Sequence, residues 1–170
     1  ISYVLSGELE HKDSMGNGSV IRPGDVQRMS AGTGVSHSEM NHSATEPVHF
    51  LQIWIVPDEP GMPASYEQKH FPLEQRRDRW QLVGSYDGRE GSVRIYQDGS
   101  LYTTILSEGT NLTYDLDADR QVWLQVTSGA MKLNGQLVEA GDGVAVRNLH
   151  KISLVATTKN TEVLLFDLAA

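Results

Sequence analysis

The two residues best suited to chemistry in this sequence are His37 and Glu39, which are separated by a single residue. Residues 31–34 form a turn signal with two glycines, so the chain is expected to run extended from Val35 onward. Because side chains alternate along a strand, His37, Glu39 and Asn41 would point to one face. An imidazole and a carboxylate on one face suit a transition metal with open coordination positions. A solvated strand face produces the same alternation, so the pair alone does not decide between the two interpretations.

The residues around this pair follow a characteristic order. Gly24 and Asp25 form a turn before a short strand, a glycine turn follows, and Asn41 lies four residues after His37. This order resembles the second cupin motif, and the longer spacing between Gly32 and His37 is the one found in pirins. The likeness covers nearly the whole chain, and is closest to the bacterial pirin-like proteins with quercetin 2,3-dioxygenase activity. The segments that carry it are residues 3–7, 10–17, 24–27, 30–39, 52–55 and 163–167.

In pirins the metal is held by three histidines and one glutamate, so the resemblance implies His37 and Glu39 as two of the metal ligands. The other two histidines form a His-x-His before the strand that begins here at Ile1, so we expect the sequence to be a piece of a longer protein. The intact protein would hold one divalent transition metal, iron in first place, with manganese, nickel, cobalt, copper or zinc as alternatives. With only two of the four ligands, the 170-residue chain is expected to hold little or no metal.

The resemblance implies a metal-dependent dioxygenase that opens flavonols such as quercetin with O₂. Glu39 would then also be the catalytic base that takes the flavonol hydroxyl proton. Met29, Gln52 and Trp54 are candidates for the pocket wall. The alternative is a non-enzymatic, metal-containing pirin that regulates or binds another protein. The truncated chain itself is expected to be inactive, and the family likeness implies a cytoplasmic protein.

The composition excludes several other classes of protein. With 39% hydrophobic and 21% charged residues, the chain is predicted to be globular, neither disordered nor membrane-spanning. The net charge of −8 argues against direct nucleic-acid binding, which normally needs a basic face. There is no cysteine, so a metal would have to be bound by nitrogen and oxygen.

The elements that would position these residues are short strands separated by turn clusters, without a helical period, which indicates an all-β sandwich or barrel. Together with the resemblance, this predicts two cupin (jelly-roll β-barrel) modules in tandem, the first incomplete at its N-terminus. Residues 1–57 would form the remainder of the N-terminal metal-binding cupin, residues 58–79 a proline-rich crossover linker, and residues 80–170 a degenerate C-terminal cupin. An unpaired edge of the first barrel is expected to favour self-association.

An internal repeat supports this organisation, because residues 6–10 match 128–132 and residues 20–25 match 137–142. His150 is the counterpart of His37, but Ile152 stands in place of Glu39, so His150 is predicted not to bind metal. His11 and Asp13 lie together in a predicted hairpin. They are open to two interpretations, support of the metal ligands or structural hydrogen bonding.

Overall fold

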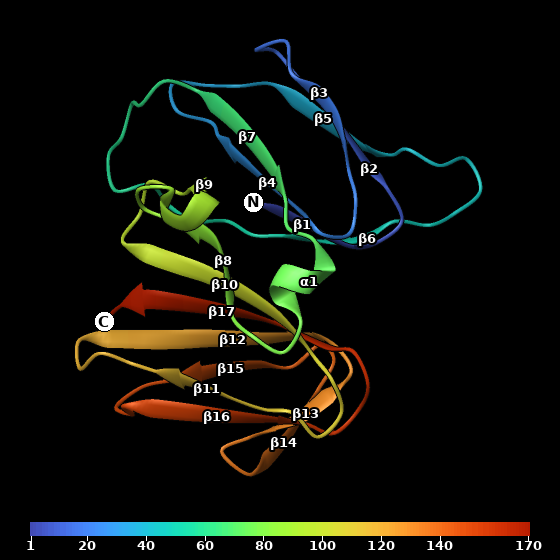
Figure 1. The fold of residues 1–170 in the computed structure, drawn as a ribbon. Helices are drawn as coiled ribbons and strands as arrows, with labels where there is room; N and C mark the ends of the chain where they lie inside the picture. Colours follow the sequence, from blue (N-terminus) through green and yellow to red (C-terminus); the bar gives the residue numbers. More distant parts are fainter. The chain divides into compact units, whose positions relative to one another are not determined.

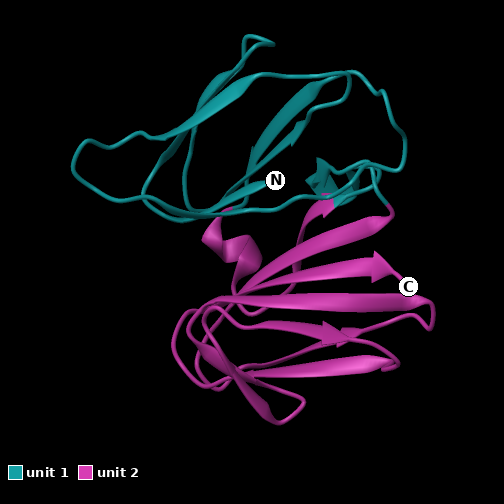
Figure 2. Ribbon diagram, turned by 180° about the vertical axis from the view of Figure 1, so that it is seen from behind, with its two compact units in different colours: residues 1–71, 85–97 teal, residues 72–84, 98–170 magenta.

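The computed structural model describes residues 1–170 and is built almost entirely of β-strands (Figure 1). The chain divides into two compact units, which Figure 2 colours separately. Unit 1 comprises residues 1–71 and 85–97, and unit 2 comprises residues 72–84 and 98–170. No helix in the chain has the length and apolar character needed to cross a membrane.

Unit 1 contains two antiparallel sheets. One has the strand order β6-β1-β4-β7 and the other has the order β3-β2-β5, so β5 lies at a sheet edge. The elements of unit 1 are β1 (Ser2–Ser6), β2 (Leu9–Asp13), β3 (Gly18–Ile21), β4 (Asp25–Ser30), β5 (His37–Asn41), β6 (His49–Gln52), β7 (Ser65–His70), a 3-10 turn η1 (Arg89–Gly91) and β9 (Val93–Arg94).

The register of the smaller sheet brings polar side chains into the interior of unit 1. In β2, Leu9 and His11 are buried while Lys12 is exposed, as the alternation of a strand requires. The pairing of β2 with β5 sets His11 opposite Glu39 and Asp13 opposite His37. The two predicted ligands therefore lie next to a buried histidine and its neighbouring carboxylate.

Unit 2 is a pair of antiparallel sheets, whose strands are labelled in Figure 1. One layer has the order β15-β12-β17-β10-β8, and the other has the order β11-β16-β13-β14. The core between them is aliphatic and includes Leu124, Met131, Ile152 and Leu165. The elements are α1 (Leu73–Arg76), β8 (Gln81–Ser85), β10 (Gly99–Leu106), β11 (Asn111–Asp115), β12 (Arg120–Ser128), β13 (Ala130–Leu133), β14 (Gln136–Glu139), β15 (Gly143–Val146), β16 (Lys151–Ala156) and β17 (Thr161–Ala169).

The internal repeat is visible in matching turns. The carboxylate of Asp25 accepts a hydrogen bond from the Arg22 N–H at 2.8 Å, and that of Asp142 accepts one from the Glu139 N–H at 2.9 Å. The glycine before each aspartate has a φ of +97°, a conformation that glycine adopts without steric penalty. The same local chemistry therefore closes the same turn in both units.

The division of the chain differs from the predicted boundaries. Residues 58–79 are predicted to be a linker, yet Ser65–His70 form β7, which pairs with β4 along its whole length. Residues 85–97 also belong to unit 1, where the Asp58 N–H donates to the Tyr96 carbonyl at 3.0 Å. The side chains of β7 are polar on both faces and mostly half-buried, so neither alternation nor an apolar run marks this strand in the sequence.

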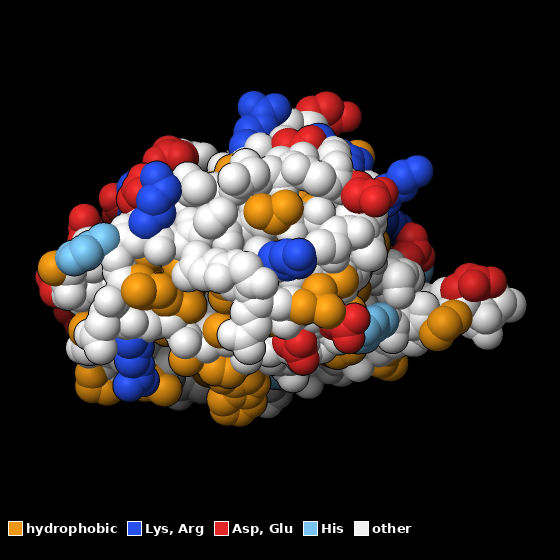
Figure 3. Space-filling view, turned by 90° about the horizontal axis from the view of Figure 1, so that it is seen from below, with side chains coloured by type: hydrophobic (Ala, Val, Ile, Leu, Met, Phe, Trp, Pro, Cys, Tyr) orange, Lys and Arg blue, Asp and Glu red, His pale blue; other side chains and the backbone are white.

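The surface carries hydrophobic side chains in several separate places. Trp54 is 90% exposed and Val56 is 79% exposed in unit 1, and Leu137 is 55% exposed in unit 2. Figure 3 shows the face seen from below, where hydrophobic groups reach the surface among polar ones and Lys and Arg side chains are scattered. A single exposed hydrophobic residue such as Leu137 is common on folded proteins.

Candidate active site

The carboxylate of Glu39 is fixed by two side chains from neighbouring strands. Ser2 Oγ on β1 donates to Glu39 Oε1 at 3.0 Å, and Gln52 Nε2 on β6 donates to Glu39 Oε2 at 3.2 Å. Ser2 and Gln52 are direct partners across β1 and β6, so both side chains point to the same face of their sheet. The pairing of β1 with β6 thus orients the carboxylate of Glu39, which lies on β5, the edge strand of the other sheet.

His11 lies directly beside Glu39 and has no exposed surface. Its ring stacks against the His37 ring, with the centroids 5.6 Å apart, and against the Tyr66 ring, with the centroids 4.9 Å apart. His11 Nδ1 is 3.8 Å from Glu39 Oε1 and has no hydrogen-bond partner. The imidazole therefore forms a buried wall that supports both residues of the predicted ligand pair.

Asp13 holds the opposite side of this imidazole, with Oδ2 lying 3.2 Å from His11 Nε2. Burial of the Asp13 carboxyl opposes its ionisation, but hydrogen bonds from Asn17, His11 and the Met15 backbone outweigh this effect and lower its pKa to about 2. An ionised carboxylate can only accept hydrogen bonds, so His11 Nε2 must carry the proton that lies between the two side chains. His11 Nδ1 is the nitrogen that faces Glu39.

A cavity of about 660 Å³ opens beside these residues in unit 1. His37 and Glu39 line it, together with the three predicted wall residues Met29, Gln52 and Trp54. Further lining comes from residues 53, 55–57 and 59–62, which are mostly hydrophobic or proline. The cavity therefore combines a wide apolar wall with a small polar end, which is typical of sites for small organic ligands.

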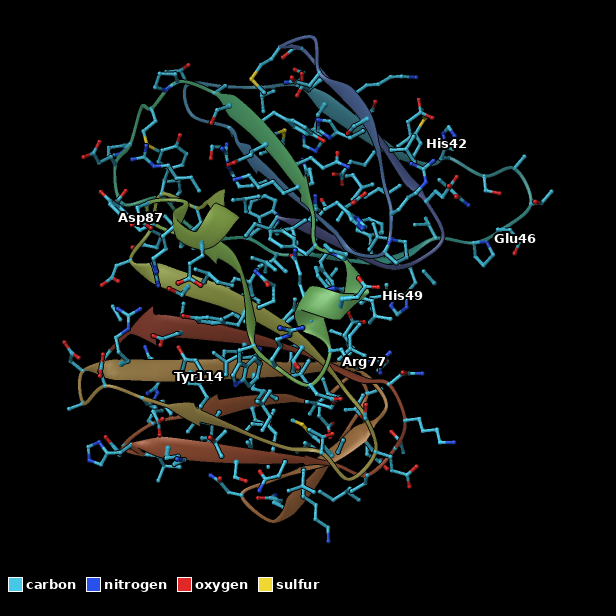
Figure 4. All side chains as sticks on the ribbon, viewed as in Figure 1. His42, Glu46, His49, Arg77, Asp87 and Tyr114 are labelled. Atoms are coloured by element: carbon cyan, nitrogen blue, oxygen red, sulfur yellow. The ribbon has the colours of Figure 1, made fainter.

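The remaining histidines have other partners or lie apart. His42 Nδ1 is 2.9 Å from a carboxylate oxygen of Glu10, and His70 Nδ1 is 2.7 Å from a carboxylate oxygen of Asp25. His42 and His49, both labelled in Figure 4, are exposed at the surface of unit 1. His150 is an exposed residue that follows β15 in unit 2.

The donors on this chain match a transition metal in kind but not in number. His37 offers a nitrogen and Glu39 offers oxygen, and these are donors that such cations accept. No group of three or more His, Cys, Asp or Glu side chains in the chain is arranged to hold a metal ion. A transition metal prefers roughly four to six donors, which is more than these two side chains offer.

His37 and Glu39 are predicted as metal ligands from the sequence, but part of their surroundings is not. The sequence does not single out Ser2, and it leaves His11 with two open interpretations. Each acts through a strand that is distant in sequence, so only the register reveals the contact. A usable signal is present in His11 itself, because a histidine on the same strand face as Leu9 is placed in the interior.

Two modules built on the same turns, the first with a His–Glu pair beside a cavity, define the chain as a tandem cupin protein. The family model described as Pirin matches residues 1–55, and the model described as Quercetinase C-terminal cupin domain matches residues 82–168. The chain belongs to the pirin family.

Individual relatives agree with this assignment. The chain is 44% identical over 168 residues to a quercetin 2,3-dioxygenase of Escherichia coli K12, covering 99% of this chain and 71% of the relative. It is 39% identical over 172 residues to a putative quercetin 2,3-dioxygenase of Pasteurella multocida, with the same coverage of 99% and 71%.

Solved structures show the same relationship. The crystal structure of YhhW from E. coli matches with a TM-score of 0.92 and 44% identity, covering 98% of this chain and 70% of that chain. The structure of bacterial pirin YhhW in complex with nickel(II) matches with a TM-score of 0.90 and 42% identity, covering 99% of this chain and 71% of that chain.

Proposed function

We propose that the protein is a pirin-type dioxygenase that opens the ring of a flavonol such as quercetin with O₂. The observation that carries the proposal is the position of Glu39, a carboxylate fixed by two hydrogen bonds at the polar end of a largely apolar cavity. The names of the E. coli and P. multocida relatives support the same reaction class. A flat aromatic substrate with one acidic hydroxyl fits both parts of this cavity.

The residues of the chain would divide the work as follows. The apolar wall around Trp54 would bind the aromatic rings and exclude water, which strengthens polar interactions at the other end. Glu39 would take the proton of the flavonol hydroxyl, because Ser2 and Gln52 hold its carboxylate in one orientation. His11 would keep the His37 ring in place by stacking against it.

A divalent transition metal held by His37 and Glu39 would supply Lewis acidity and a path for electrons to O₂. The solved relative with nickel(II) supports a divalent metal, and iron remains our first expectation for this protein. The remaining ligands would come from water or from residues that this chain does not contain. We therefore propose that the chain as given binds metal weakly and has little activity, whereas a protein with the full ligand set is active.

The test replaces Glu39 by glutamine in a protein that includes the upstream region of the family. Glu39→Gln keeps the shape of the side chain but removes the base, so turnover of quercetin should fall by ~10²–10⁴-fold while quercetin binding changes far less. Loss of quercetin absorbance measures turnover. Glu46→Gln is the matched control, because Glu46 lies on an outer loop of unit 1 (Figure 4).

Two results would overturn parts of this proposal. Turnover of Glu39→Gln within threefold of the parent would remove Glu39 as the base. If the parent does not turn over quercetin with iron, manganese, nickel, cobalt or copper, the proposed dioxygenase activity is wrong. That result would favour a non-enzymatic, protein-binding pirin.

A further inference from the structure

A row of four polar side chains crosses the larger sheet of unit 1. Gln52 on β6 is paired with Ser2 on β1, Ser2 with Gln27 on β4, and Gln27 with Gln68 on β7. Residues that face each other across antiparallel strands point to the same side of the sheet. The four side chains therefore share the face that carries the hydrogen bonds to Glu39.

Three members of this row have hydrogen bonds that explain their polarity. Ser2 and Gln52 both donate to the carboxylate of Glu39. Gln68 Nε2 donates to Asp25 Oδ2 at 3.2 Å, and Gln68 Oε1 accepts from the Tyr66 hydroxyl at 2.8 Å. Each of these side chains is therefore part of the polar framework of unit 1.

Gln27 is the member of the row whose amide nitrogen has no such role. Its side chain is only 2% exposed, and its Nε2 is buried without a hydrogen-bond partner. A buried donor without a partner is unfavourable and is uncommon in folded proteins. Gln27 nevertheless lines the same cavity as His37 and Glu39. The nitrogen itself is covered, and a half-turn of the terminal amide would bring it to the cavity that Gln27 lines, one strand away from Ser2.

We propose that Gln27 is a substrate-binding residue whose carboxamide donates a hydrogen bond to an oxygen of the ligand bound against Glu39. This inference rests on the proposed function and adds a recognition contact to it. The ligand class is a planar aromatic compound with neighbouring hydroxyl and carbonyl oxygens, because the Glu39 carboxylate can accept a hydrogen bond from a hydroxyl while the Gln27 amide can donate one to a carbonyl. Glu39 would accept a hydrogen bond from the ligand and Gln27 would donate one to it, and together these two contacts would fix the orientation of the ligand.

The test is Gln27→Met, which keeps the length of the side chain and removes both the donor and the acceptor. Quercetin affinity is measured in the protein that includes the upstream region, in the presence of Ni²⁺, through quenching of tryptophan fluorescence, since Trp54 lines the cavity. Thermal unfolding is measured without quercetin. We expect about 10-fold weaker binding of quercetin, which corresponds to the loss of one hydrogen bond. The melting temperature should stay equal or rise, because the variant removes an unpaired buried donor.

Gln68→Met is the matched control from the same row. It removes hydrogen bonds that the folded protein already makes, so it should lower the melting temperature. If Gln27 had a purely structural role, Gln27→Met would lower the melting temperature as much as Gln68→Met does. Gln27→Leu repeats the measurement with a second side chain in case the methionine variant does not fold.

Unchanged quercetin affinity in Gln27→Met, or a fall in melting temperature equal to that of Gln68→Met, would overturn the proposal and point to an internal water or a structural contact. Binding is measured separately from turnover, so the two proposals can fail separately. A parent that binds quercetin without consuming it would overturn the proposed reaction and leave the comparison at Gln27 valid. A parent that does not bind quercetin would overturn both.

Discussion

At the scale of single residues, the orientation of the site depends on a carboxylate that does not line the cavity. Asp13 receives hydrogen bonds from Asn17 and the Met15 backbone as well as from His11, and its side chain has no exposed surface. Burial opposes ionisation of this carboxyl, but the hydrogen bonds favour the charged form more strongly and hold its pKa at about 2. The ionised carboxylate accepts a hydrogen bond from His11 Nε2, which leaves Nδ1 as the ring nitrogen that faces Glu39.

This pKa gives a prediction for the acid stability of the protein. The pKa of Asp13 is lower in the folded chain than the value of about 3.9 expected when unfolded, so ionised Asp13 stabilises the fold above that value. The contribution should be lost as the pH falls from about 4 to about 2. Asp13→Asn should be less stable than the parent at pH 7 and should lose less stability over this acid range. Urea unfolding at a series of pH values measures it, and equal pH dependence in both proteins would contradict the argument.

The sequence reveals residues whose chemistry is local and hides those whose role is set by pairing. His37 and Glu39 can be found because a spacing of two puts them on one face of their own strand. Ser2 and Gln27 cannot be found in this way, because the register of β1 with β4 and β6 decides that their side chains share a face with Gln52. Strand register depends on long-range contacts, so it cannot be read from one segment.

At the scale of elements, the loop before β5 is held close to another backbone segment. Gly32 has a φ of +53°, and a Cβ atom placed there would lie 2.1 Å from the Met62 carbonyl oxygen. The neighbouring Thr33 N–H donates to that same oxygen at 3.0 Å. The close approach needs glycine, and it fixes the point from which β5 carries His37 toward the cavity.

Gly32→Ala should therefore be strongly destabilising. Alanine is strained at the positive φ of this position, and its methyl group would also collide with backbone atoms. We therefore expect a loss of at least about 2 kcal/mol in the free energy of unfolding. Gly16→Ala is the control, because Gly16 also has a positive φ of +92° but has no atom within 4 Å of the position that an added methyl group would occupy. That variant should lose about 1 kcal/mol from backbone strain alone. Equal losses in urea unfolding would show that the contact with Met62 is unimportant.

Most strands can be predicted from their turns, but β7 shows where this approach fails. Glycine and proline clusters mark the ends of most other strands in the chain. In β7 the run from Ser65 to His70 consists of polar and aromatic residues without alternation, and its local pattern predicts a linker. It is a strand because β4 offers it a complete ladder of partners, which is tertiary context rather than local preference.

At the scale of the whole molecule, the two units differ in how they are filled although they are of similar length. Eight of the buried hydrophobic side chains lie in unit 1 and eighteen lie in unit 2. The interior of unit 1 instead contains buried polar residues, among them His11, Asp25 and Gln27. Hydrophobic burial is the main favourable contribution to folding, so unit 1 should be the less stable unit.

Hydrogen exchange should show this difference directly. We expect the amides of β12 and β17 to exchange most slowly and those of β5, an edge strand with mostly exposed side chains, to exchange fastest among the strands. Mass spectrometry of peptides after timed labelling measures it. Equal and strong protection of β5 and β17 in a monomer would contradict the prediction.

The division of the chain also constrains how the protein can be made. Synthesis on the ribosome delivers residues 1–71 before the rest of the two units, but unit 1 still lacks residues 85–97 at that stage, and residues 72–84 of unit 2 emerge before them. The first unit therefore cannot mature before the ribosome has begun the second. A gene cut after residue 79 would encode a first module without Tyr96, whose carbonyl accepts the Asp58 N–H. Translation therefore begins the second unit before it completes the first, and completes the second last.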